Sequence, residues 1–130
     1  MAVFCPLYSG SSGNSVYLET EESAVLIDLG VSCRAAVNAL KSLNADVQKL
    51  KGILITHEHS DHIKGLSVFL KKYPVPLFGS PAVLDYLREN VKLPETVELK
   101  EAPLEGFSVG QLRVKPFHTS HDSVGSLGYR

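Results

Sequence analysis

Residues 52–62 read GILITHEHSDH, an apolar stretch that runs directly into a cluster of histidines and acidic residues. The apolar part has the composition of a buried β-strand, and the polar part holds three of the chain's five histidines. Alternate side chains of an extended stretch project to the same side. We therefore expect His57, His59 and Asp61 to converge, and His62 to begin the turn into a helix. Solvated histidines are the alternative for any one of these residues, but four ligand-type residues at this spacing predict a metal site.

The segments on either side alternate between predicted strands and predicted helices. Ser32 and Ser80 are residue types that cap helix N-termini, and Pro81 suits a first helical position. The sequence contains no internal repeat and no linker. We expect helices at 33–43, 63–72 and 81–90, and strands at 2–6, 15–19, 24–29, 52–56, 75–78, 97–100, 107–109, 112–117 and near Leu127.

Composition limits the class of protein without choosing a function. The 130 residues are 44% hydrophobic and 21% charged, with a formal net charge of -1, which suits one compact domain and gives no overall basic field. No apolar run approaches the roughly 20 residues that span a bilayer. Cys5 and Cys33 form no CxxC pair, and the N-terminus lacks the features of a signal peptide. We therefore expect a reduced, cytoplasmic chain that does not enter a membrane.

Several motifs carry a resemblance to a known family. The pattern HxHxDH at 57–62, after an apolar strand, resembles the signature of the metallo-β-lactamase fold superfamily, and LIDLG at 26–30 resembles its upstream strand-end aspartate motif. SGSSGNS at 9–15, and FHTSHD at 117–122 with the pair at 128–129, resemble the YycJ/WalJ-like hydrolase branch. The resemblance implies an α/β (α+β) fold, the N-terminal half of an αβ/βα sandwich, with one mixed sheet and helices on one face. Residues 1–130 would form a single domain that is truncated at its C-terminus.

The resemblance also implies a set of metal ligands. His57, His59 and His121 would bind a first metal ion, and Asp61 and His62 a second. The family's bridging aspartate and final histidine cannot be assigned here. After His121 the only acidic residue is the adjacent Asp122, and no further histidine follows, so we expect the second ion to be weakly held or absent. Zinc is the expected metal, up to two ions, with manganese or iron as alternatives.

Two further residues are expected to support the site. Asp28 is expected to cap backbone N–H groups at its strand end and, in doing so, to hold the metal loop and orient one of its imidazoles. In a strand, His118 and His121 point to opposite faces, so His118 is expected to be a supporting residue and not a ligand.

The implied function is a metal-dependent hydrolase. When full length it would be a phosphodiesterase that acts as a DNA exonuclease, with Asp61 as the catalytic residue that holds the second metal and helps to orient the nucleophile. Its partners would be DNA or a small phosphodiester. This chain alone is expected to be poorly active. The alternatives are an inactive metal-binding half-domain, and a thioester or lactone hydrolase of the same superfamily.

Two surface features bear on partners. Lys64, Lys71 and Lys72, with Lys49 and Lys51, would form either a basic edge near the metal loop or an ordinary solvated helix face. The strand at 24–29 and the side chains of Leu84 and Leu87 are not expected to be all buried by so few elements, which predicts a homodimer through the exposed half-fold face.

Overall fold

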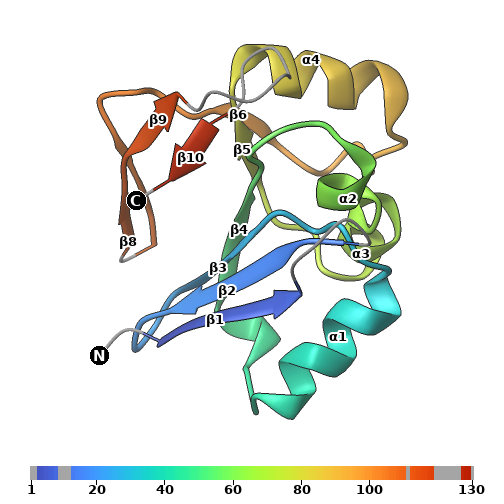
Figure 1. Cartoon of the computed structure of the whole chain (residues 1–130), viewed down its shortest axis with the longest axis vertical. Coiled ribbons are helices and arrows are strands. Elements are labelled where there is room, and N and C mark those ends of the chain that lie inside the picture. The colour runs from blue at the N-terminus through green and yellow to red at the C-terminus, as the bar shows by residue number, and fades with distance from the viewer. Residues whose placement is uncertain (1–2, 9–12, 111, 119–126, 130) are drawn as a thin grey trace.

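A six-stranded mixed sheet forms the centre of the computed structural model, which describes residues 3–8, 13–110, 112–118 and 127–129 (Figure 1). The strands follow one another across the sheet in chain order. The first two pairings are antiparallel and the remaining three are parallel. The strands are β1 (Val3–Tyr8), β2 (Ser15–Glu19), β3 (Ala24–Ile27), β4 (Leu50–Leu54), β5 (Leu77–Gly79) and β6 (Leu99–Glu101).

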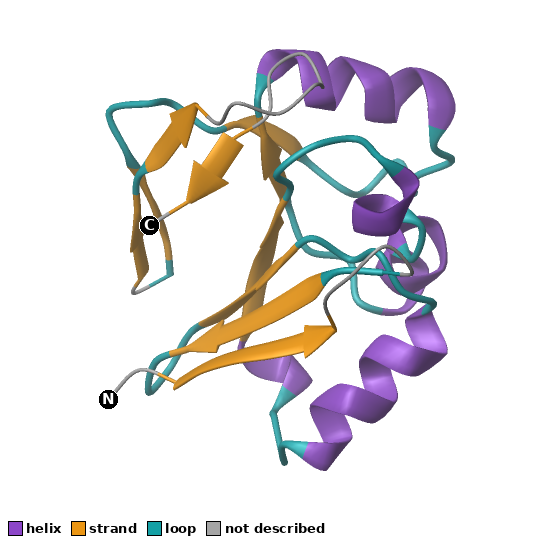
Figure 2. Cartoon of the chain, viewed as in Figure 1, coloured by secondary structure: helices purple, strands orange, loops and turns teal. Residues whose placement is uncertain are grey.

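The helices lie together on one face of this sheet, as predicted (Figure 2). The Ser32 hydroxyl accepts a hydrogen bond from the Ala35 N–H at 3.1 Å, and the Ser80 hydroxyl accepts one from the Val83 N–H at 3.3 Å. Both expected N-caps are therefore confirmed. The helices are α1 (Cys33–Ser42), α2 (Ser60–Ile63), α3 (Leu66–Lys72) and α4 (Pro81–Asn90), with a 3₁₀ turn, η1, at Val47–Lys49. No helix in the described part of the chain is long and apolar enough to cross a bilayer.

Each face of the sheet buries its own apolar core. Neighbouring strand residues point to opposite faces, so Leu26 packs into the core under the helices and Val25 into the core on the other side. A hairpin of β7 (Phe107–Val109) and β8 (Leu112–Val114) covers that second face. A further hairpin, β9 (Pro116–His118) and β10 (Leu127–Tyr129), lies on the same side in Figure 1.

The expected exposure of apolar residues is wrong. Leu26 and Leu87 are fully buried and Leu84 is 3% exposed, because the β7–β8 hairpin covers one face while α4 packs against the other. One apolar hollow remains on the second face, with a volume of about 190 Å³. Phe4 lies at this hollow and is 65% exposed.

The helix expected at 63–72 is two helices. The α2 helix already begins at Ser60, and the chain breaks at Gly65 before α3 begins. The Gly65 N–H donates to the Leu29 carbonyl at 2.9 Å, and a Cβ on Gly65 would lie 2.0 Å from the Val31 carbonyl oxygen. The break therefore comes from a close approach of the segment after β3. The strand expected at 112–117 is likewise divided, into β8 and β9.

We expect Gly65→Ala to lower the free energy of unfolding by about 3 kcal/mol. The new methyl group would clash with a backbone carbonyl, which cannot rotate away as a side chain could. At an unobstructed helical position the same change would stabilise the protein by about 1 kcal/mol. Urea denaturation of this variant beside Ser67→Ala, in the first turn of α3, measures the effect. Equal midpoints for the two variants would contradict it.

Candidate metal centre

The polar residues of the predicted metal loop meet where β3 and β4 end. The two strands are parallel, with Ile27 opposite Leu54, so the residues that follow them emerge at the same edge of the sheet. The Ile55 N–H donates to the Phe78 carbonyl at 2.8 Å, which continues the register for one more residue. The chain then leaves the sheet at Thr56 and forms the loop that leads into α2.

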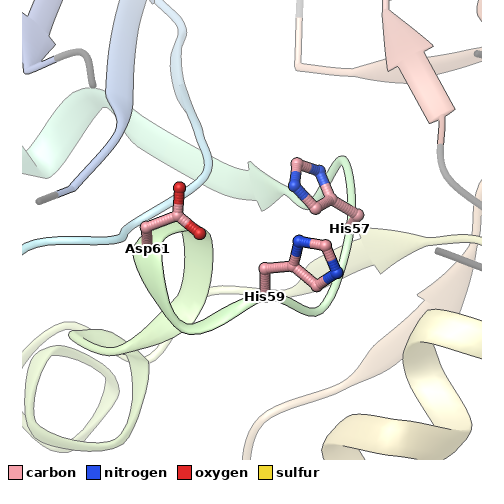
Figure 3. Close-up of side chains that lie close together, drawn as sticks. All are labelled: His57, His59 and Asp61. Atoms are coloured by element: carbon pink, nitrogen blue, oxygen red, sulfur yellow. The ribbon is translucent and has the colours of Figure 1, made fainter. Parts of the chain in front are cut away.

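Three of the predicted ligands converge in this loop. One ligand atom from each of His57, His59 and Asp61 lies within 4.8 Å of the others, and Figure 3 shows the Asp61 carboxylate pointing toward the two imidazoles. His57 is 6% exposed, whereas the Asp61 side chain is 30% exposed. The cluster is therefore anchored on the buried side and open to solvent on the other.

The convergence arises differently from the expectation. His57 and His59 belong to the loop, but Asp61 lies in the first turn of α2, for which His59 is the N-cap residue. A helical turn, and not the alternation of an extended chain, therefore brings the carboxylate round to the imidazoles. Two imidazoles and a carboxylate fit zinc and related divalent metals in chemistry and in spacing.

The Asp28 carboxylate binds both ends of the metal loop. It is 3% exposed. One oxygen accepts the Thr56 N–H at 2.7 Å, and the other accepts the Thr56 hydroxyl at 2.6 Å and lies 2.5 Å from His62 Nδ1. The residue has a φ of 64°, in the left-handed region that few non-glycine residues adopt. Asp28 thus both caps a backbone N–H and orients an imidazole.

His62 faces Asp61 with its second ring nitrogen. Its Nε2 lies 3.5 Å from Asp61 Oδ2, while Nδ1 is taken up by Asp28. Burial disfavours the charged imidazolium, but the hydrogen bond to Asp28 and the negative charges of Asp28 and Asp61 outweigh this, and the pKa of His62 is raised. Since a ligating histidine is commonly held through its other ring nitrogen, Nε2 is the atom that could reach a metal beside Asp61.

Thr56 was missed as a site residue by the sequence analysis. Its hydroxyl has one proton, which it donates to Asp28, and the same oxygen lies 2.9 Å from His57 Nδ1. The Thr56 oxygen then accepts a hydrogen bond from Nδ1–H of His57, and in this tautomer Nε2 of that ring is unprotonated and able to bind a metal. The position of Thr56, immediately before the first histidine, was the available signal.

Asn14 is a second missed residue. Its side-chain amide donates to Asp61 Oδ2 at 3.0 Å and to the Asp61 carbonyl at 3.1 Å, and its backbone N–H donates to the same carbonyl at 2.7 Å. The Gly30 N–H in turn donates to the Asn14 carbonyl at 2.8 Å. The stretch at 9–15 resembles a branch of the family, but nothing local in it indicates this contact with a residue 47 positions away.

Two predicted site residues are not placed. The side chain of His118 and all of His121 lie outside the described residues. The ligand role of His121 and the supporting role of His118 therefore remain predictions.

Thr56→Val keeps the shape of the side chain but removes the hydroxyl. We expect it to lower the free energy of unfolding by about 2 kcal/mol, because the buried Asp28 carboxylate and His57 Nδ1 each lose a partner. Thr56→Ser retains the hydroxyl and is expected to lose much less. Chemical denaturation in the presence of a chelator, so that bound metal does not contribute, measures both. The prediction fails if the two variants are equally stable.

Comparisons with known proteins agree with this geometry. A family model described as the metallo-beta-lactamase superfamily matches residues 8–130. The exodeoxyribonuclease YycJ of Bacillus anthracis is 34% identical over 129 residues, which cover 97% of this chain and 48% of that protein. The exodeoxyribonuclease WalJ of Streptococcus pneumoniae is 37% identical over 128 residues, which cover 95% of this chain and 47% of that protein. The chain therefore spans about half the length of these curated relatives.

Solved structures agree on the fold. The Rm3 metallo-beta-lactamase superposes with a TM-score of 0.76 at 22% identity, over 97% of this chain and 55% of that one. The metallo-beta-lactamase SMB-1 superposes with a TM-score of 0.77 at 20% identity, over 97% of this chain and 56% of that one. The mixed sheet with helices on one face is thus the metallo-beta-lactamase fold that the resemblance implied. The family model covers nearly every residue of the chain. The chain belongs to the metallo-beta-lactamase superfamily.

Proposed function

We propose that this chain carries the metal-binding half of a hydrolase that cleaves the phosphodiester bonds of DNA from an end. The observation that carries the proposal is the convergence of His57, His59 and Asp61 in a partly open site, held by the buried carboxylate of Asp28. The substrate class is supported by the two relatives named as exodeoxyribonucleases, at 34% and 37% identity. The two free cysteines support a cytoplasmic location.

We propose zinc as the metal, with manganese or iron as alternatives. His57 and His59 would hold a first ion together with His121, and Asp61 with His62 Nε2 would contribute to a second. A bound divalent ion supplies Lewis acidity and positive charge beside a phosphodiester.

Other residues of the chain would position these ligands. Thr56 sets the tautomer of His57, and Asp28 orients His62. Asn14 holds the carboxylate of Asp61, which we propose as the catalytic residue, toward the site.

The double variant His57→Ala/His59→Ala tests the metal site. We expect the 130-residue chain to bind about one zinc ion, because two imidazoles and a third protein ligand make a catalytic-type site, and the double variant to bind none. Ser60→Ala, at the exposed first residue of α2 directly after the loop, is the matched control. Elemental analysis after dialysis gives the stoichiometry, and a metal content unchanged in the double variant would rule out this site.

Activity measurements decide the substrate class. This chain and the Bacillus anthracis relative are each assayed on end-labelled duplex DNA, bis-p-nitrophenyl phosphate and a thioester. We expect metal-dependent phosphodiester cleavage that is far slower in this chain, because no carboxylate that would bridge two ions can be assigned in it. Cleavage of the thioester alone would favour the thioester or lactone hydrolase. Zinc binding without any hydrolysis would favour an inactive half-domain.

We also propose that the chain self-associates through the second face of the sheet. The apolar hollow there is lined in part by Phe4, Leu18 and Ile27, and exposed apolar patches mark association surfaces. The adjacent β1 strand is one of the two edge strands of the six-stranded sheet in the described structure, and an unpaired strand edge can pair with another chain.

Sedimentation equilibrium at micromolar concentration tests the association. We expect a dimer that Phe4→Ser shifts toward monomer, because the exposed ring would lose its contact area. Tyr86→Ser also removes an exposed aromatic side chain, but from α4, and is expected to leave the dimer unchanged. A monomer at every concentration would disprove the proposal.

A further inference from the structure

A basic hollow lies between α1 and α3. Its volume is about 390 Å³, and it is lined by Arg34, Asn38 and Lys41 of α1 and by Val68 and Lys72 of α3, among others. We call it the α1–α3 groove. In Figure 1 the two helices lie on the same side of the sheet as α2, so the groove belongs to the helix layer and not to the second face.

The groove is rich in unpaired positive charge. Arg34, Lys41 and Lys72 are exposed, and within the described part of the chain none of them forms an ion pair. No carboxylate is among the residues that line the hollow in the described structure. The sequence of α1 contains no acidic residue, and that of α2 and α3 contains only Asp61, which belongs to the metal loop. The charge that lines the groove in the described structure is therefore positive.

This surface differs from the basic edge that the sequence predicted. Lys49 pairs with Glu19 at 2.6 Å, so its charge is already compensated. Arg34 and Lys41 take its place, because α1 packs beside α3 and turns these two side chains toward Lys72.

The groove is rigidly connected to the metal loop. The Leu29 N–H donates to the His62 carbonyl at 2.8 Å, and the Gly65 N–H donates to the Leu29 carbonyl at 2.9 Å. The same segment leads within a few residues into Ser32, the N-cap of α1. A ligand that lies in the groove is thus held at a fixed position relative to the candidate metal centre.

We propose that the α1–α3 groove binds the phosphate backbone of nucleic acid, at a stretch of the substrate remote from the bond to be cleaved. The proposal rests on the proposed function for its substrate class. Arg34 and Lys41 are seven residues apart, about 10 Å along the helix, which corresponds to about three steps of DNA rise per strand. Guanidinium, ammonium and side-chain amide groups are the usual donors to phosphate oxygens, and they act without regard to sequence.

Two charge-matched variants test the groove. The first is Arg34→Gln/Lys41→Gln/Lys72→Gln. The control is Lys92→Gln/Arg113→Gln/Lys115→Gln, which removes the same number of exposed cations elsewhere. Binding of the 130-residue chain to a labelled duplex is followed by fluorescence anisotropy in EDTA, over a series of salt concentrations.

We expect the groove variant to reduce the slope of log K against log salt by about 2 to 3, since each lost phosphate contact removes about one unit. Its affinity at low salt should fall at least tenfold, while the control keeps the slope of the unmodified chain. Equal losses in the two variants would overturn the proposal, as would the absence of salt-dependent DNA binding by the unmodified chain. Binding to polyglutamate or to phosphatidylserine vesicles that depends on the groove, with DNA binding that does not, would also overturn it. Lys72→Gln alone, checked for cooperative unfolding, serves if the triple variant does not fold, and it should lower the slope by about one.

The groove proposal and the metal-site proposal can be tested independently of each other. His57→Ala/His59→Ala is expected to keep the full salt slope in EDTA, because it leaves the groove intact. Loss of metal binding in that variant with an unchanged slope supports both proposals. If the unmodified chain binds metal as expected but the groove variant binds DNA as well as the control variant does, only the groove proposal is overturned.

Discussion

The buried carboxylate of Asp28 is the constraint on which this edge of the sheet depends. A buried charge is costly unless it is hydrogen-bonded, and here the backbone and side chain of Thr56 and the ring of His62 supply three partners. All three lie in the segment after β4, whereas Asp28 follows β3. The left-handed φ of 64° at Asp28 turns the chain at the strand end, and its backbone N–H donates to the Leu54 carbonyl at 2.7 Å. The metal loop is therefore positioned by the end of another strand.

The close packing of two backbones makes this arrangement rigid. A Cβ on Gly30 would lie 1.7 Å from the Asp61 carbonyl oxygen, so only glycine lets the segment after β3 come this close to α2. The same carbonyl accepts hydrogen bonds from Asn14, and Asn14 is held by Gly30. The Asp61 carboxylate thus sits on a support built from three separate parts of the sequence. Such preorganisation matters because ligands that are already in place need no ordering when they bind.

What could be predicted from the sequence is what depends on near neighbours. The strand at 15–19 and the caps at Ser32 and Ser80 follow from local pattern, and so does the approach of His57 to His59 across one residue. The break before α3 could not be predicted, because it depends on the Val31 carbonyl, which is distant in sequence. Asn14 was missed for the same reason, since its partner Asp61 is 47 residues away. The burial of the strand at 24–29 was misjudged because the short strands after residue 100 carry little individual signal, yet β7 and β8 together cover the second face of the sheet. Leu84 and Leu87 are buried on the opposite face, where α4 packs against the sheet.

Net charge misleads for a related reason. The formal charge of -1 averages over a surface on which charge is unevenly distributed. Arg34, Lys41 and Lys72 line the α1–α3 groove, and no carboxylate lines it in the described structure, while α4 carries Asp85 and Glu89. Screening limits exposed charges to a range of about 10 Å at 0.1 M salt, so a polyanion at α1 experiences the local cations far more than the distant acids. Where the fold puts each charge, and not their sum, therefore decides whether a chain that is neutral overall can hold a phosphate backbone.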